Sequence, residues 1–157
     1  LVNYACKLRD SGLPAAGIAE EVERLKDQVR VFAIVDTLEY LRRGGRLTGI
    51  QAGLGAVTRL KPVIAVRDGV VAIAHRSFGM AAAVKHLLKL LEEQPVDDDF
   101  PSYFLYTGDR SREELLLPKL KERGMLPLRL HYCSVGPTIG AHAGPGALGL
   151  AYMEREA

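Results

Sequence analysis

An Asp-Gly pair between two apolar, β-branched runs is the feature that most limits the folds open to this chain. Asp68 and Gly69 separate the runs at 63–67 and 70–75, and this arrangement is a strong signal for a tight β-hairpin. Elsewhere helical and extended patterns alternate. Since a tight hairpin joins antiparallel strands, the sequence predicts an α/β (α+β) fold, a mixed β-sheet with a central hairpin and helices packed on it. A purely parallel doubly wound sheet is excluded.

The spacing of apolar residues predicts the remaining elements. Helices are expected where apolar residues recur every three or four positions, at 14–29, 38–43, from Thr48, at 80–93 and at 111–124. Pro118 predicts a kink or a late start in the last of these. Strands are expected at 31–35, 103–106, 128–134 and 147–153, with a glycine-rich loop at 136–146. Asp36 with Glu39, and Ser111 with Glu114, have the spacing of capping boxes.

The length of 157 residues suits a single domain over residues 1–157, because a chain of this size buries roughly 68–70% of its unfolded surface. No apolar run approaches the roughly 20 residues of a membrane span, so no membrane span is expected. The first residue is Leu1 rather than Met. This suggests a processed or truncated chain.

Positive charge is concentrated in one stretch. The net charge is +2, but residues 41–76 carry seven Lys and Arg against Asp68 alone, and the segments on either side are each −2. Aromatic residues are only 6% of the chain and do not interleave with the basic ones, which argues against stacking on single-stranded nucleic acid. The stretch therefore indicates a surface that faces an anion or a protein partner, and no nucleic acid is expected.

Cysteine and histidine give no sign of a metal or cofactor. Cys6 and Cys133 are far apart and lack C-x-x-C spacing, which is typical of reduced thiols in a cytoplasmic protein. The four histidines add no ligand cluster. Residues 144–149 match G-x-G-x-x-G, but only eight residues follow, too few for the βαβ unit of a dinucleotide site.

Two segments carry candidate binding residues. His142 stands among small residues between Gly140 and Gly144, where an imidazole can face a cleft and donate a hydrogen bond to an anion. Thr138, Gly144 and Gly146 lie beside it in sequence. In the segment RRGGR at 42–46, two glycines expose backbone N–H groups, and Arg43 and Arg46 could turn toward an anion. His75, His86 and His131 are expected to be structural.

Three segments together resemble the DegV family. They are 36–47 (DTLEYLRRGGRL), 61–69 (KPVIAVRDG) and 136–149 (GPTIGAHAGPGALG), in the family's order and approximate spacing. The resemblance implies a bacterial, cytoplasmic, two-domain protein that binds fatty acids. Some members are binding subunits that present a fatty acid to a fatty acid kinase for acyl-phosphate formation. This chain resembles the C-terminal domain only, so the resemblance implies that the N-terminal domain would be absent from it.

The resemblance also implies that different residues bind the acyl tail, bind the carboxylate and face the kinase. The acyl tail of a long-chain fatty acid would lie in an apolar tunnel, where each buried CH₂ contributes about 0.8 kcal/mol. His142 would bind the carboxylate with Thr138 and the backbone of Gly144 and Gly146 nearby. Arg46 and Arg43 would lie near the phosphate or the kinase.

Two alternatives stay open. The first is an enzyme of acyl or phosphoryl transfer with His142 as general acid/base, although the sequence offers no Ser or Cys nucleophile with an evident partner. The second concerns assembly, because loss of a domain would uncover apolar surface and favour a homodimer.

Overall fold

Six strands form one mixed sheet in the computed structural model, which describes residues 1–46, 59–67 and 69–156. The strands are β1 (Val29–Ile34), β2 (Leu60–Arg67), β3 (Val70–Phe78), β4 (Ser102–Tyr106), β5 (Leu130–Ser134) and β6 (Leu148–Met153). Their order across the sheet is β3-β2-β1-β6-β4-β5, and β4 with β5 is the parallel pair. The predicted α/β fold with a mixed sheet is confirmed.

The predicted hairpin forms β2 and β3, with Arg67 opposite Val70 and Val66 opposite Val71. Gly69 has φ +72°, as a tight turn requires. The hairpin lies at one end of the sheet, so the expectation that it would be central is wrong. The reason is that β1 pairs with β2 on one side and with β6 on the other, which leaves β3 as an edge strand.

The helices predicted from periodicity are largely confirmed. They are α2 (Ala15–Leu25), α3 (Glu39–Arg43), α4 (Met80–Glu93) and α5 (Leu117–Glu122). Helix α5 starts late, as Pro118 predicted, after a short 3₁₀ turn, η2 (Glu113–Leu115). Another 3₁₀ turn, η1 (Lys26–Gln28), joins α2 to β1. The helix expected from Thr48 falls outside the described residues.

Two helices were not predicted. Helix α1 (Val2–Asp10) buries none of its residues, and no element is predicted from the sequence before residue 14. Helix α6 (Pro137–Ala143) lies in the segment expected to be a loop. Proline is well tolerated at the start of a helix, and Gly144, with φ +74°, ends it.

Both predicted capping boxes are wrong. Thr37 Oγ1, not Asp36, accepts the hydrogen bond from the Glu39 N–H, at 3.2 Å. Ser111 does not begin the α5 helix. The Asp36 carboxylate instead binds two cationic side chains described below.

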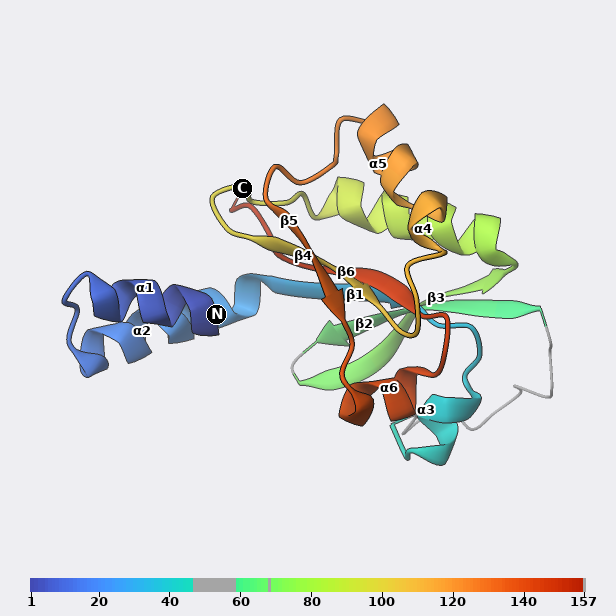
Figure 1. Cartoon of the computed structure of the whole chain (residues 1–157), viewed down its shortest axis with the longest axis horizontal. Helices are drawn as coiled ribbons and strands as arrows, with labels where there is room; N and C mark the ends of the chain where they lie inside the picture. Colours follow the sequence, from blue (N-terminus) through green and yellow to red (C-terminus); the bar gives the residue numbers. More distant parts are fainter. Residues whose placement is uncertain (47–58, 68, 157) are drawn as a thin grey trace.

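The two faces of the sheet are packed differently. The face that we call the α4 face carries Phe32, Ile34, Val63, Phe104 and Leu150, all fully buried against α4 and α5. The opposite face, which we call the α6 face, carries half-buried residues at the alternate positions Val31, Ala33, Ile64, Leu105 and Ala151. Figure 1 shows α4 and α5 on one side of the sheet, α3 and α6 on the other, and α1 with α2 projecting away.

Candidate functional site

Helices α3 and α6 meet at the end of the sheet where β1 stops and β6 begins. Leu38 and Leu41 pack with Val35, Leu60 and Ala147 in a small second core, which half-buried Ile64 and Ile73 of the α6 face also contact. This second core joins the α3–α6 end to the α6 face of the sheet.

His142 packs directly on Gly44. A Cβ added to Gly44 would overlap Nδ1 and Cε1 of the imidazole, so any other residue at position 44 would push the ring away. The Nδ1 atom is buried and has no hydrogen-bond partner among the described residues. Because an unpaired buried polar atom costs about 1–3 kcal/mol, this atom requires a partner that these residues do not supply.

A second glycine contact fixes the C-terminal end of α6. Gly144 packs on the ring of Tyr40 from α3, and a Cβ there would overlap it. Thr107, which follows β4 and is buried, donates a 2.6 Å hydrogen bond to the Gly144 carbonyl and accepts one of 2.8 Å from the Ala147 N–H. One hydroxyl therefore ties both ends of the turn between α6 and β6.

Three charged side chains cluster beside the same turn, and one of them, Arg112, binds it directly. Asp36 Oδ1 accepts hydrogen bonds from Lys61 Nζ and Arg112 Nη1, each of 2.8 Å. Arg112 Nη1 also donates to the carbonyl of Gly146, at 2.7 Å. Burial by itself would raise the pKa of the Asp36 carboxyl, but the hydrogen bonds from Lys61 and Arg112 and their charges outweigh it. The pKa is lowered from its ordinary value, so the carboxylate stays ionised.

The other predicted binding residues lie around this cluster. Thr138 is exposed and one helical turn before His142 on α6, so both side chains share a side of the helix. Arg46 is exposed and donates a 3.0 Å hydrogen bond to the carbonyl of Gly44, the glycine under the His142 ring. Arg43 points to solvent and pairs with Glu39 at 2.7 Å. Hydrogen bonds from Arg42 and Arg43 lower the pKa of Glu39 to about 2.

A groove of about 1080 Å³ opens at the other end of the α6 face. Its walls include Val2 and Tyr4 of α1, and Val29, Ala151 and Tyr103 of the sheet. Asn3 donates a hydrogen bond to the Tyr103 hydroxyl, at 2.9 Å. The apolar α6 face thus runs between the α3–α6 end and this groove.

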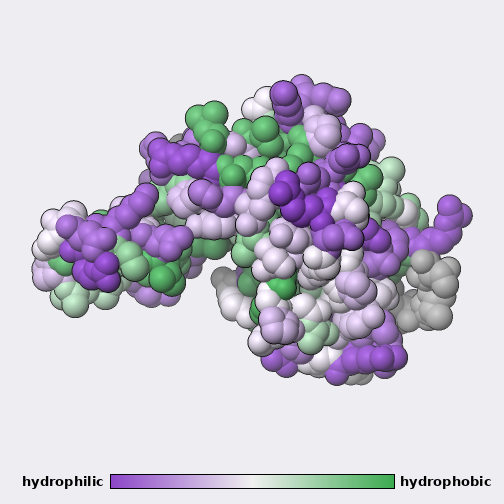
Figure 2. Space-filling model, in the orientation of Figure 1, coloured by the Kyte–Doolittle hydropathy of each residue, from purple (hydrophilic) through white to green (hydrophobic). Residues whose placement is uncertain are grey.

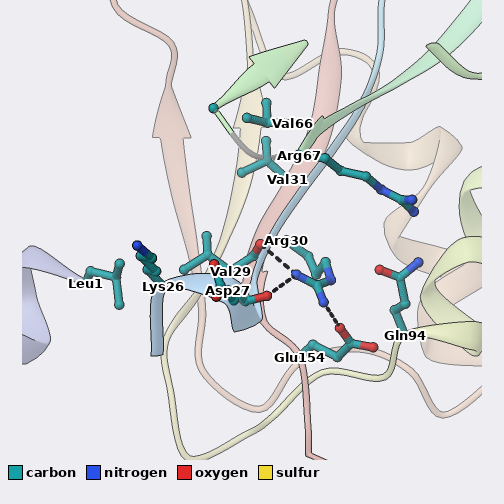
Figure 3. Close-up of a pocket in the computed structure, with 11 residues that line it drawn as sticks. Leu1, Lys26, Asp27, Val29, Arg30, Val31, Val66, Arg67, Gln94 and Glu154 are labelled. Carbon is teal, nitrogen blue, oxygen red and sulfur yellow. Dashed lines mark hydrogen bonds and ion pairs between the residues drawn. The ribbon is translucent and has the colours of Figure 1, made fainter. Parts of the chain in front are cut away.

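A more polar hollow of about 910 Å³ lies beside the start of β1 (Figure 3). Arg30 pairs there with Glu154 and donates a hydrogen bond to the Val29 carbonyl, at 3.2 Å. Val29 opens β1, and the His142 site is at the strand's other end. The hollow is therefore separate from the candidate site.

The remaining histidines are away from His142. His75 of β3 and His86 of α4 stack with ring centroids 3.3 Å apart, and the Nδ1 of His86 lies 2.8 Å from the Ala82 carbonyl. His131 lies beside Tyr103, at 5.6 Å between ring centroids. Within residues 1–46, 59–67 and 69–156, no three His, Cys, Asp or Glu side chains group as metal ligands.

Apolar side chains also reach the surface away from the site. Leu126 and Leu128, between α5 and β5, are exposed, and Figure 2 shows apolar surface gathered in that region. None of the helices in the described parts of the chain is long and apolar enough to cross a membrane.

Comparison with known proteins identifies the family. The model of the family described as "Uncharacterised protein, DegV family" matches residues 1–155. The chain belongs to the DegV family. A DegV domain-containing protein of Staphylococcus aureus is 28% identical over 153 residues, which are 97% of this chain and 53% of that protein.

Solved DegV structures share the fold. A fatty-acid-binding DegV family protein from Thermus thermophilus is 31% identical, with a TM-score of 0.81 over 97% of this chain and 55% of its own. DegV from Bacillus subtilis, a fatty-acid-binding protein, is 26% identical with a TM-score of 0.68 over 96% of this chain and 54% of its own. The chain spans about half the length of the DegV relatives that it matches.

Sequence patterns missed several residues that build the site in this DegV chain. Thr107 and Arg112 come from the segment after β4, far from α6 in sequence, and no local pattern connects them to it. Lys61 could have been recognised from the sequence, because a lysine inside a buried strand needs an acidic partner. The two glycines of RRGGR are expected from the sequence to expose backbone N–H groups, whereas the structure shows that Gly44 makes room for the His142 ring.

Proposed function

We propose that this chain binds a long-chain fatty acid, with the carboxylate at His142 and the tail along the α6 face. The observation that carries the proposal is the buried Nδ1 of His142, which has no partner among the described residues. A carboxylate oxygen would accept a hydrogen bond from this nitrogen. Thr138, on the same side of α6, is the nearby group that would complete the anion site. The N–H groups of Gly144 and Gly146 already donate to the carbonyls of Gly140 and Thr107, at 2.8 Å and 3.3 Å, so these glycines hold α6 and the turn in place rather than bind the anion.

The α6 face supports the proposal for the tail. Its central positions are small, with Ala33, Gly149 and Ala151 side by side on β1 and β6, and its flanking positions are apolar. From Leu148 to Met153 the sheet extends about 17 Å, at roughly 3.4 Å per residue. Burial of methylene groups along this length would provide most of the affinity, at about 0.8 kcal/mol for each CH₂.

The test is the affinity of His142→Gln for palmitate and oleate, measured by calorimetry, with native mass spectrometry of co-purified lipid. A hydrogen bond to a charged group contributes about 1.5–3 kcal/mol, so we expect a loss on the order of 10- to 100-fold. His75→Gln removes an imidazole from the other side of the sheet and should leave affinity unchanged. Equal effects of the two variants, or no binding by the wild-type chain, would contradict the proposal.

We also propose that the exposed arginines beside the site face a fatty acid kinase subunit, which converts the bound carboxylate to an acyl phosphate. Arg46 is the better candidate because it contacts the Gly44 carbonyl directly, while Arg43 is engaged by Glu39. In this proposal the chain binds and presents the substrate, and His142 is a ligand-binding residue rather than a general acid/base.

Arg46→Ala tests the presentation step. We expect acyl-phosphate formation by the kinase to fall at least several-fold while fatty-acid affinity stays the same. Arg123→Ala is the control, because Arg123 is also exposed but pairs with Glu92 of α4, on the opposite side of the sheet. If the rate of acyl-phosphate formation were unchanged in Arg46→Ala, Arg46 would not be part of the surface that faces the kinase.

We propose further that the chain is a single domain, the C-terminal half of a two-domain cytoplasmic protein. Coverage of only 53–55% of its relatives supports the half-length assignment, and the two free cysteines suit a reducing compartment. On its own, this half would bury exposed apolar surface by forming a homodimer. Sedimentation of the isolated chain and of the whole protein would distinguish these states.

A further inference from the structure

Arg112 connects two parts of the site that lie far apart in sequence. Its Nη1 atom donates to Asp36 Oδ1 at 2.8 Å and to the Gly146 carbonyl at 2.7 Å. Asp36 follows β1, and Gly146 precedes β6. The guanidinium therefore bridges the chain entering α3 and the chain leaving α6, the two helices that hold Gly44 and His142.

The fit between Arg112 and the turn is close. Gly146 has φ +73°, and a Cβ added there would lie 2.7 Å from the guanidinium carbon. Any other residue at position 146 would displace Arg112, and movement of Arg112 would free the carbonyl. The side chain is thus seated against a backbone surface that only glycine can provide.

The turn that Arg112 holds follows α6 directly. Gly144 ends the helix two residues after His142, and Thr107 binds the Gly144 carbonyl and the Ala147 N–H. Since His142 lies in van der Waals contact with Gly44, a small shift of α6 would either press the ring into α3 or withdraw it. The position of the imidazole therefore depends on how the turn is anchored.

Lys61 has a different part in the same cluster. It donates to Asp36 Oδ1 and to the Asp36 carbonyl, at 2.8 Å and 3.0 Å, and makes no hydrogen bond to the turn. With two cations around one carboxylate, Lys61 balances the charge of Asp36. Of the two cations, Arg112 is the one that also binds Gly146, whose N–H donates to the Thr107 carbonyl at 3.3 Å.

We propose that Arg112, oriented by Asp36, is a positioning residue that sets the place of His142 for a carboxylate ligand. This inference rests on the proposed function only for the identity of the ligand. The effect of Arg112 on the position of His142 can be measured without any ligand. An ion pair that merely stabilised the fold would have no selective effect on this imidazole. The cluster therefore separates into a stabilising cation, Lys61, and a positioning cation, Arg112.

The experiment compares Arg112→Gln, Arg112→Lys and Lys61→Met in the full chain. For each variant, the imidazole NMR resonances of all four histidines are recorded without ligand, and palmitate affinity and the thermal midpoint are measured. For Arg112→Gln we expect the His142 resonances to move while those of His75 and His86 stay, with about 10-fold weaker affinity. Arg112→Lys, which keeps the charge and a donor, should recover part of both changes.

Lys61→Met should lower the thermal midpoint and leave the His142 resonances in place. The inference would be overturned if Arg112→Gln left the His142 resonances unchanged. It would also be overturned if Arg112→Gln and Lys61→Met changed the His142 resonances and the palmitate affinity to the same extent. If the wild-type chain bound no palmitate but Arg112→Gln still moved His142 alone, the positioning inference would stand and the proposed function would fail.

Discussion

The α4 face and the α6 face are built on the same six strands, yet they serve different purposes. On the α4 face, large side chains such as Phe32, Phe104 and Leu150 are sealed beneath α4 and α5. On the α6 face the central positions are small, and the flanking residues are only half-buried. The difference indicates that the α4 face supplies most of the stability, while the α6 face leaves apolar surface on which the proposed fatty-acid tail would lie.

Truncating matched isoleucines should show the largest difference between the faces. Ile34, on the α4 face, is completely buried, and Ile34→Ala should cost about 2–5 kcal/mol in the free energy of unfolding. Ile64→Ala, on the α6 face, should cost only roughly 1–2 kcal/mol, because the side chain is half-buried. Urea denaturation measures the free energy of unfolding of both variants. Equal losses would show that the two faces contribute equally to stability.

Filling the α6 face should affect binding more than folding. Ala151→Phe places a ring over the small positions of β6 and displaces the space of about two to three CH₂ groups, so palmitate affinity should fall roughly 10- to 50-fold. Ala81→Phe, at an exposed position of α4, should change neither affinity nor stability. Retention of full affinity by Ala151→Phe would mean that the tail does not lie on this face.

Acid should weaken the α3–α6 end through Asp36. The pKa of this carboxyl is lowered in the folded chain, and an unfolded Asp titrates near ~3.9. Its contribution is therefore fully present above about pH 4 and lost as the pH falls through the lowered folded value. The free energy of unfolding of Asp36→Asn should depend less on pH below ~4 than that of the wild type.

Asp10→Asn provides the control for this effect, because Asp10 forms an exposed pair with Arg9 in which both side chains are about two-thirds accessible. Such pairs contribute little to stability, so the pH profile of Asp10→Asn should follow that of the wild type. If the free energy of unfolding of Asp36→Asn fell with pH as steeply as that of the wild type, other carboxyl groups would dominate acid unfolding.

The elements predicted with nearly their observed bounds are those whose sequence signals all lie close together along the chain. Helix α4 matches its predicted range at 80–93, because its apolar stripe and its flanking residues agree. The hairpin follows from Asp68-Gly69, and the late start of α5 follows from Pro118, which lacks the N–H of a helix interior. In each case the deciding interactions lie within a few residues of one another.

Predictions failed where distant residues compete for the same group. Asp36 has the spacing of a capping residue, but Lys61 and Arg112 bind its carboxylate instead. Helix α6 forms in a glycine-rich segment because Thr107, Tyr40 and Arg112 hold its end and the turn after it. None of these partners is visible from the local pattern.

The sequence by itself determined the mixed sheet, most of its helices and the segments that contain His142 and Arg46, since local propensities and periodicity encode them. Only the tertiary structure decided that Gly44 lies under His142, that Arg112 bridges Asp36 and Gly146, and that the hairpin occupies an edge of the sheet. Those features depend on contacts between residues from about 30 to 120 positions apart, and such contacts form only when the strands have paired.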